Sequence, residues 1–341
     1  MRDAQHGAFP IKLSGFSFTW NWDVRIFCGM LWLMEKNKVT TTNNLNVYIA
    51  TLPRSGSTIL GLMLNQHPSI VHMGESSYWG KLEAPPTRCS CGLSPVCPFI
   101  LDIYNKTLGD SNVKSIYNVC SAVDKLQEPN KIYHSDSLPD YRTKVFGHNR
   151  LKEELRRAVI GLDKLAQIHR NKTNKPIVVD NTKYIELAQE LLKQKNWKVI
   201  ILLRDPRGIA FSNKESGKRK KVPRPVVNKI PVFINFIDKA KKLSEKQNAL
   251  VVLYENLCEN TKETLERVCD FLSIPYEEDM LKFNQNRGHL FMGNRLLFNE
   301  NLDTKLKQDN AWESGLNKKE LNLIEGNKNL INLYKEFNYF K

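Results

Sequence analysis

The sequence predicts an α/β fold with a central parallel sheet and helices on both of its faces, and three observations support this class. Short β-rich runs alternate along the chain with longer segments whose apolar residues recur at helical spacing. Residues 198–203 (KVIILL) form a nearly continuous apolar run, which is typical of a strand covered on both faces of a parallel sheet. The first β-rich run leads through a tight polar loop into a helical pattern, as in a strand–loop–helix unit.

The first half of the chain contributes one predicted strand and two predicted helices. Residues 46–51 (NVYIAT) predict the strand, and the apolar residues at positions 59–64 place one face of a helix directly after it. Residues 84–98 are rich in proline and cysteine, which excludes a long regular element there. From 149 to 169, apolar side chains recur every three or four residues and predict a long helix.

The second half repeats the alternation of strand and helix. In chain order we expect a strand at 176–180 (PIVVD), a helix through 185–192, the strand at 198–203, a helix after the loop at 205–208, a strand at 249–254 (ALVVLY) and a helix at 261–272. Alternation at these lengths favours parallel pairing, because each helix crosses from one strand to the next.

The chain has 341 residues, enough for one large α/β domain or two smaller ones. We interpret residues 1–44 as an N-terminal extension and residues 45–341 as a single domain. The apolar stretch at 26–34 is too short to cross a bilayer, which takes about 20 residues, and no signal-peptide order surrounds it. Seven cysteines, an odd number in a chain this large, indicate a reducing cytoplasm.

The net charge of +15 points to an anionic partner. No pattern of a nucleic-acid-binding motif is present, and the basic residues are spread along the chain apart from one cluster at 218–224. A small polyanionic ligand is therefore the simplest interpretation, with no nucleic acid as partner. The cluster itself is read as a solvated loop, with attraction of an acidic acceptor such as a polyanionic glycan as the alternative.

The strongest local motif is residues 51–58 (TLPRSGST), between the first strand and its helix. Backbone N–H groups of such a loop and of the first helical turn form an anion site, which the helix dipole favours. The predicted contacts come from Arg54, Ser55, Gly56, Ser57 and Thr58. The lysine and the first glycine of a nucleotide-hydrolysing P-loop are missing, which argues against Walker-type ATP or GTP chemistry. The alternative is a serine-rich turn that only caps a helix.

A second motif, residues 202–212 (LLRDPRGIAFS), follows the buried strand. Arg204 stands at the carboxyl end of that strand, where open α/β sheets bind ligands. Ser212 lies eight residues further on, in the helix that we expect to follow. Together the two side chains are candidates for a second phosphate at some distance from the first.

These motifs resemble those of sulfotransferases that use 3′-phosphoadenosine 5′-phosphosulfate (PAPS). Residues 53–60 (PRSGSTIL) resemble the family's 5′-phosphosulfate loop, and Arg204 and Ser212 match its 3′-phosphate pair in residue type and spacing. Residues 252–255 (VLYE) and the helix that ends in residues 271–275 (FLSIP) resemble a later strand and helix of the family. The resemblance runs from about residue 46 to the C-terminus. It implies a sulfotransferase fold related to the P-loop nucleoside triphosphate hydrolases, with PAPS as the donor and no required metal.

The resemblance also implies catalytic residues. Glu75, in the run HMGESS, resembles the glutamate base of the tyrosylprotein and carbohydrate branches of the family, and a solvated loop carboxylate is the alternative. Lys183 resembles the lysine near the transferred sulfonate, and Arg54 is expected to assist it at the bridging oxygen. Residues 293–295 resemble a loop that folds over the nucleotide, from which Arg295 is a candidate for the 3′-phosphate. His67 and His72 are weaker candidates for the base.

Cys89, Cys91 and Cys97 form a tight cluster in the sequence. Three cysteines can bind zinc with a fourth ligand, for which the sequence offers Cys120, His134 or His148. The C-x-C-x₅-C spacing is not a common zinc pattern, however, and small buried thiols are frequent. We therefore assign no metal ligand, while the sequence alone leaves the question open.

Two rivals to a sulfotransferase are a small-molecule or nucleotide kinase and a non-catalytic protein that binds adenosine 3′,5′-bisphosphate. A kinase should carry a P-loop lysine and metal-binding carboxylates, and chelation should abolish its activity. A binding protein should be indifferent to loss of Glu75. The sequence does not name the acceptor, which is a small molecule, a glycan or a peptide, and it says nothing of the oligomeric state.

Overall fold

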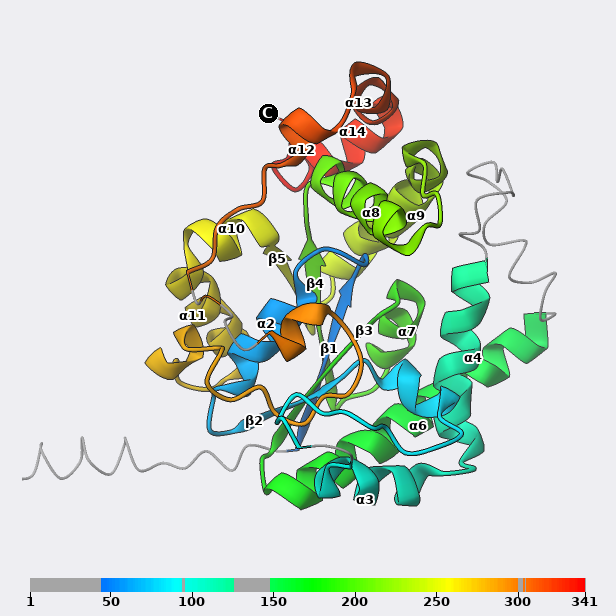
Figure 1. The fold of residues 1–341 in the computed structure, drawn as a ribbon, viewed down its shortest axis with the longest axis vertical. Helices are drawn as coiled ribbons and strands as arrows, with labels where there is room; N and C mark the ends of the chain where they lie inside the picture. Colours follow the sequence, from blue (N-terminus) through cyan, green and yellow to red (C-terminus); the bar gives the residue numbers. More distant parts are fainter. Residues whose placement is uncertain (1–43, 94–95, 126–147, 300–302, 304, 341) are drawn as a thin grey trace, which may run out of the picture. The chain divides into compact units, whose positions relative to one another are not determined.

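A parallel sheet lies at the centre of the fold (Figure 1). The computed structural model describes residues 44–93, 96–125, 148–299, 303 and 305–340. In that part of the chain five strands pair in the order β2-β3-β1-β4-β5, and every neighbouring pair is parallel. The strands are β1 (Leu45–Thr51), β2 (Ile70–Gly74), β3 (Ile177–Lys183), β4 (Trp197–Leu203) and β5 (Ala249–Leu253).

Helices connect the strands and extend the chain beyond β5. The described α-helices are α2 (Ser57–Asn65), α3 (Pro98–Thr107), α4 (Ser111–Lys125), α6 (His148–Thr173), α7 (Ile185–Leu191), α8 (Pro206–Lys220), α9 (Ile230–Ser244), α10 (Tyr254–Glu259), α11 (Thr261–Leu272), α12 (Trp312–Gly315), α13 (Lys318–Glu325) and α14 (Lys328–Lys335). Short 3₁₀ helices are η1 (Ser76–Lys81), η3 (Val226–Lys229), η4 (Glu278–Leu281) and η5 (Arg295–Phe298).

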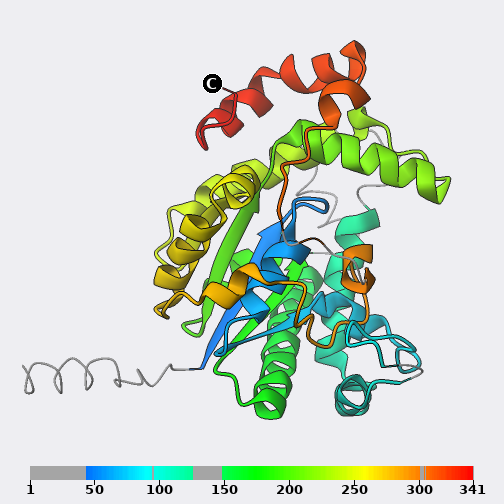
Figure 2. The same ribbon diagram turned by 60° about the vertical axis from the view of Figure 1, so that its left-hand side comes forward.

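The sheet is buried on both faces. Successive side chains of a strand point to opposite sides, and in β1 the side chains on both sides are buried. In β1, Tyr48 and Ala50 belong to the core that includes residues of α6, α7 and α9. Val47 and Ile49 belong to the core that includes residues of α2, α10 and α11. Figure 2 shows α11 (yellow) on one side of the strands and α6 (green) on the other. The predicted fold class, a parallel sheet with helices on both faces, is confirmed.

One strand of the sheet, β2, was not predicted from the sequence. Its five residues (IVHMG) are all buried and pair with β3, but the run is short and contains a histidine. His72 is 3% exposed, so a polar side chain lies inside this strand. The omission matters for function, because β2 ends directly before Glu75.

Parallel pairing places the carboxyl ends of all five strands at one edge of the sheet. The loop that contains Arg54 leaves β1, Glu75 follows β2, and Lys183 is the last residue of β3. Arg204 follows β4 and Tyr254 follows β5. Most of the predicted site residues therefore come from this edge, although they are up to 150 positions apart in the sequence.

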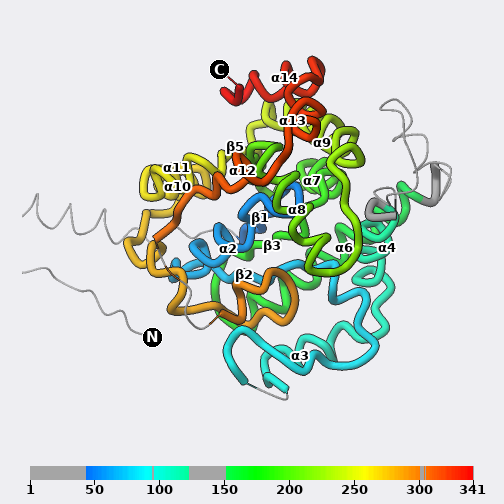
Figure 3. The backbone as a smooth tube through the Cα atoms, turned by 45° about the horizontal axis from the view of Figure 1, so that its top comes forward, coloured from blue at the N-terminus to red at the C-terminus, as the bar shows by residue number. Residues whose placement is uncertain are grey.

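The C-terminal helices α12, α13 and α14 lie beside α8 and α9 (Figures 1 and 3). The guanidinium of Arg207, in the first turn of α8, lies 4.0 Å from the ring centroid of Trp312 and 4.6 Å from that of Phe340. Tyr339 donates a hydrogen bond of 2.5 Å to Glu255, the second residue of α10. These contacts hold the C-terminal segment next to the end of β5.

Residues 1–43, which include most of the predicted extension and its apolar stretch, lie outside the described residues. Within the described ranges, no helix combines the length and the hydrophobicity that a membrane crossing requires.

The buried His169 of α6 predicts acid sensitivity. Its Nδ1 lies 2.8 Å from the Leu165 carbonyl oxygen, and burial lowers its pKa to about 4. Between this value and the ordinary value near 6.5, the unfolded chain binds a proton that the folded chain does not, so the histidine reduces stability as pH falls. We expect the free energy of unfolding to drop by about 2 kcal/mol less in His169→Gln than in the wild type between pH 7 and pH 5. Urea titrations at both pH values measure this, and equal drops would contradict it.

Candidate active site

A cavity of about 470 Å³ opens at the carboxyl ends of the strands. Its lining includes the predicted residues Arg54, Gly56, Ser57, Thr58, Glu75 and Lys183, which derive from the ends of β1, β2 and β3. The remaining wall comes from α7, α8, α9 and the segment at 293–296. The predicted anion loop and the predicted catalytic residues Glu75 and Lys183 therefore line the same cavity.

The anion loop turns sharply between β1 and α2. Arg54 and Gly56 have positive φ angles of 80° and 90°, and α2 begins at Ser57. A Cβ atom at residue 56 would lie 2.5 Å from the ring of Tyr254, so glycine is required by both the backbone angle and the packing. The tight turn lets the positive end of the α2 dipole face the cavity, where Ser57 and Thr58 form part of the wall.

Ser55 carries an observation that points to a ligand in this loop. The side chain is 1% exposed, and its hydroxyl oxygen has no hydrogen-bond partner among the described residues. A buried hydroxyl without a partner costs about 1–3 kcal/mol. An oxyanion bound in the loop would accept the missing hydrogen bond, so the residues present fit a phosphate or sulfate group.

The cavity is electropositive. Burial lowers the pKa of Arg54, and the positive charges of Arg219 and Arg224 lower it further. Lys220 and Arg224, from the predicted basic cluster at 218–224, also line the cavity. Part of this cluster thus faces the site, and an anion would relieve the repulsion among its charges.

Glu75 and Lys183 form an ion pair in the cavity wall. Their side chains are 16% and 12% exposed, so each retains access to the cavity while being shielded from bulk water. The Lys183 ammonium also donates a hydrogen bond of 3.3 Å to the Asn181 carbonyl, and its backbone has a positive φ of 87°. A carboxylate that can accept a proton and a cation that can neutralise developing charge therefore stand side by side.

Asp180 holds this pair in place, a role that sequence reasoning missed. It is the last residue of the predicted strand at 176–180, and in the structure it lies in β3 and is completely buried. Its carboxylate accepts hydrogen bonds from the Ser76 N–H at 3.2 Å and the Thr182 N–H at 2.8 Å. Burial raises the pKa of Asp180 to about 6. The hydrogen bonds join the residue after Glu75 to the residue before Lys183.

Arg204 reaches the anion loop from the start of α8. It is 6% exposed, and its guanidinium donates a hydrogen bond of 2.7 Å to the Arg54 carbonyl. The guanidinium also lies 4.5 Å from the ring centroid of Tyr254. Tyr254 thus contacts both the loop glycine and Arg204, and it is a second positioning residue that sequence reasoning missed. In the sequence, the signal for Tyr254 was its place in the run VLYE at residues 252–255, directly after a predicted strand.

Ser212 is one helical turn beyond Gly208 on α8. A Cβ atom on Gly208 would lie 3.1 Å from the Arg204 guanidinium, so Arg204 covers this face of the first turn. Residues four apart share a helix face, which places Ser212 next along it. Neither Arg204 nor Ser212 belongs to the lining of the cavity, so a donor that contacts both motifs extends beyond it.

Asp309 is the C-terminal residue that contacts Arg204, and the sequence did not indicate it. Its carboxylate lies 3.2 Å from the Arg204 guanidinium and is 48% exposed. The predicted Arg295 is exposed and begins η5, between Asn294 and Leu296, which line the cavity near Glu75. Contact between Arg295 and a 3′-phosphate stays a prediction.

The charges in the wall favour an anionic substrate. Four cationic side chains line the cavity, namely Arg54, Lys183, Lys220 and Arg224. The two acids of the lining are each paired with a lysine, Glu75 with Lys183 and Glu186 with Lys239. Apolar side chains such as Val232 and Phe236 cover another part of the wall and suit the carbon framework of a second substrate.

A family model described as the sulfotransferase domain matches residues 45–310. No curated protein matches the chain. Among solved structures, the sulfotransferase domain from the Synechococcus PCC 7002 olefin synthase is 19% identical, with 88% of this chain and 96% of that chain covered and a TM-score of 0.46.

Two further structures are similar at the same level. The sulfotransferase domain from the curacin biosynthetic pathway is 15% identical, covers 87% of this chain and 98% of that chain, and has a TM-score of 0.48. Mouse sulfotransferase SULT7A1 complexed with PAP is 12% identical, with 88% of this chain and 90% of that chain covered and a TM-score of 0.43. The family match covers more than half of the chain and confirms the predicted family. The chain belongs to the sulfotransferase family, enzymes that transfer sulfuryl groups.

Proposed function

We propose that this sulfotransferase moves the sulfuryl group of PAPS to a hydroxyl or amine of an acceptor. The observation that carries the proposal is the position of Glu75 and Lys183 in one cavity with the anion loop. The acceptor is a small molecule, a glycan or a peptide.

The donor would be held at both of its anionic ends. Residues 54–58, with the unpaired hydroxyl of Ser55, would bind the 5′-phosphosulfate. Arg204 and Ser212 would bind the 3′-phosphate, and Arg295 is the candidate for a further contact. The hydrogen bond from Arg204 to the Arg54 carbonyl supports this arrangement, because it joins the two predicted phosphate sites.

In the proposed reaction, Glu75 accepts the proton of the acceptor as the acceptor oxygen or nitrogen attacks sulfur. The new bond to sulfur forms while the bond between sulfur and the bridging oxygen breaks. The bridging oxygen keeps the electron pair and leaves as part of adenosine 3′,5′-bisphosphate. Lys183 and Arg54 would stabilise the negative charge on that oxygen. The ion pair supports these roles, since it holds the base and the cation next to each other.

We infer that the reaction needs no metal ion. The sulfuryl group carries less negative charge than a phosphoryl group, so cationic side chains and backbone N–H groups are sufficient to stabilise it. The four cations of the cavity wall support this inference.

Transfer of a sulfur label tests the proposal against the kinase alternative. The protein is incubated with ³⁵S-labelled PAPS and pools of phenols, sugars and primary amines, in buffer without added Mg²⁺ or chelator. We expect the label in one pool and an equal amount of adenosine 3′,5′-bisphosphate. Transfer of phosphate from ATP with Mg²⁺ to the same pools, with no transfer of sulfur label, would contradict it.

A further inference from the structure

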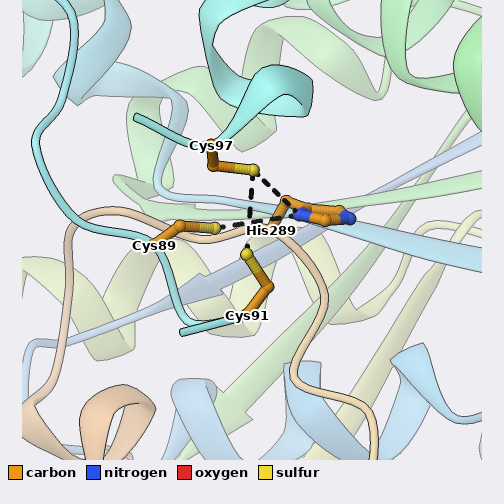
Figure 4. Close-up of side chains that lie close together, drawn as sticks. All are labelled: Cys89, Cys91, Cys97 and His289. Carbon is orange, nitrogen blue, oxygen red and sulfur yellow. Dashed lines mark hydrogen bonds between the residues drawn. The ribbon is translucent and has the colours of Figure 1, made fainter. Parts of the chain in front are cut away.

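Three thiols and an imidazole meet at one point outside the active site (Figure 4). Cys89, Cys91 and Cys97 come from the segment before α3, whereas His289 comes from the chain after η4. Their sulfur and nitrogen atoms all lie within 4.8 Å of one another. The sequence offered Cys120, His134 or His148 as a fourth ligand. The structure does not place Cys120 in this group, and the side chains of His134 and His148 lie outside the described part of the chain.

The distances fit a tetrahedral metal centre. Zinc bonds of about 2.3 Å to sulfur and about 2.0 Å to nitrogen separate two sulfur ligands by about 3.8 Å and sulfur from nitrogen by about 3.5 Å. Here the Sγ atoms of Cys91 and Cys97 are 3.7 Å apart. The Nδ1 atom of His289 is 3.3 Å from the sulfur of Cys97 and 3.8 Å from that of Cys89. A disulfide needs about 2.05 Å between sulfur atoms, so these cysteines are not bonded to each other.

Hydrogen bonds between the two segments hold the cysteines close to His289. Gly92, at a positive φ of 82°, closes a turn in which its N–H donates to the Cys89 carbonyl. Ser90, between the first two cysteines, donates from its hydroxyl to the Gly288 carbonyl and accepts from the Leu290 N–H, at 3.0 and 2.8 Å. Ser90 therefore joins the cysteine segment to the residues directly before and after His289.

The orientation of His289 is also fixed. Its ring stacks on Phe99 with centroids 4.3 Å apart and an interplanar angle of 12°. This contact leaves the Nδ1 edge directed at the thiols. Cys89 and Cys97 are buried while Cys91 is exposed, so a metal ion can reach the cluster from the surface.

We propose that Cys89, Cys91, Cys97 and His289 bind one zinc ion as a structural site. Three thiolates and one imidazole are a ligand set that zinc prefers, and four protein ligands leave no open position for catalysis. From the sequence alone we assigned no metal ligand, because the C-x-C-x₅-C spacing is not a common zinc pattern. The structure adds His289, a distant residue, as the fourth member of the ligand set.

The zinc site would fix one wall of the active site. Beyond His289, Phe291 packs edge-on against Trp79 of η1, with ring centroids 4.6 Å apart. Gly293 follows, and a Cβ atom placed on this glycine would lie 3.4 Å from the Glu75 carboxylate. A zinc ion that joins residues 89–97 to His289 would hold this segment beside the catalytic glutamate.

Metal analysis of the full chain tests the proposal. The protein is expressed with added zinc and purified without chelators, and bound metals are counted by mass spectrometry. We expect one zinc per chain in the wild type, a fall to background in Cys91→Ser and His289→Gln, and no change in Cys269→Ala. Cys269 is the matched control, because it is a buried free cysteine outside the cluster. Cys91 is the mildest ligand to remove, since it is exposed and supports no core.

Two further readouts do not depend on activity. Replacement of zinc by Co²⁺ should produce a thiolate-to-metal charge-transfer band that weakens in Cys91→Ser. A strong chelator should lower the melting temperature of the wild type but not that of Cys91→Ser. A wild type that takes up no zinc, full zinc content in both ligand variants, or a disulfide among the three cysteines would overturn the proposal. None of these outcomes bears on donor binding, which is measured separately.

Discussion

Glu75→Gln should lower kcat by about 10²–10⁴-fold, the usual contribution of a general base. Glutamine preserves the shape of the side chain but cannot accept the proton of the acceptor. It also frees Lys183 from its ion partner, so the affinity for adenosine 3′,5′-bisphosphate should be equal to or higher than that of the wild type. Initial rates at saturating PAPS give kcat, and calorimetry gives the affinity.

A second acid in the cavity wall serves as a control for this variant. Glu186 is similarly shielded, with its side chain 11% exposed, and it is paired with Lys239 at 2.8 Å, but the proposed mechanism does not use it. Glu186→Gln should keep most of the wild-type kcat. A Glu75→Gln protein that is folded, binds the bisphosphate and turns over at the wild-type rate would refute the assignment of the base and favour a different acceptor-side group.

Arg204→Ala should weaken the binding of adenosine 3′,5′-bisphosphate by about 10–100-fold. Hydrogen bonds between charged groups contribute about 1.5–3 kcal/mol, and the proposed partner of Arg204 is the 3′-phosphate. The affinity for 5′-AMP, which lacks that phosphate, should change much less. The ratio of the two affinities separates loss of a phosphate contact from general loosening of the loop, because Arg204 also holds the Arg54 carbonyl.

Asp309→Asn should change the same affinity in the opposite direction. The Asp309 carboxylate contacts the guanidinium that is proposed to bind phosphate, so it competes with the ligand or repels it. Removal of its charge should tighten bisphosphate binding and leave 5′-AMP binding nearly constant. If both variants alter the two nucleotides equally, Arg204 does not contact the 3′-phosphate.

The regular part of the fold could be predicted because local signals coincide there. The apolar run at 198–203 and the helical stripe at 149–169 correspond to β4 and to most of α6. The anion loop was recognisable for the same reason, since its arginine, glycine and hydroxyl residues are adjacent. Strand β2 was not, because the strand with which it pairs, β3, is about 100 positions away in the sequence.

The supporting residues of the site could not be predicted, because their partners are distant in sequence. Asp180 accepts from Ser76 across 104 positions, and Asp309 contacts Arg204 across 105. His289 meets Cys97 across 192 positions. Each of these residues looks like an ordinary polar residue in its local context. Only the packing of the sheet edge and of the C-terminal segments brings the partners together.

Stabilisation of the folded protein by nucleotides tests the donor assignment most directly. Thermal unfolding is measured in buffer without a chelator, with adenosine 3′,5′-bisphosphate alone and with ATP plus Mg²⁺. A ligand at about 100 times its Kd stabilises by about 2.7 kcal/mol, which corresponds to a rise in Tm of about 4 °C for a domain of about 300 residues. We predict this rise with the bisphosphate and little change with ATP. A rise with ATP and Mg²⁺ alone would contradict PAPS as the donor.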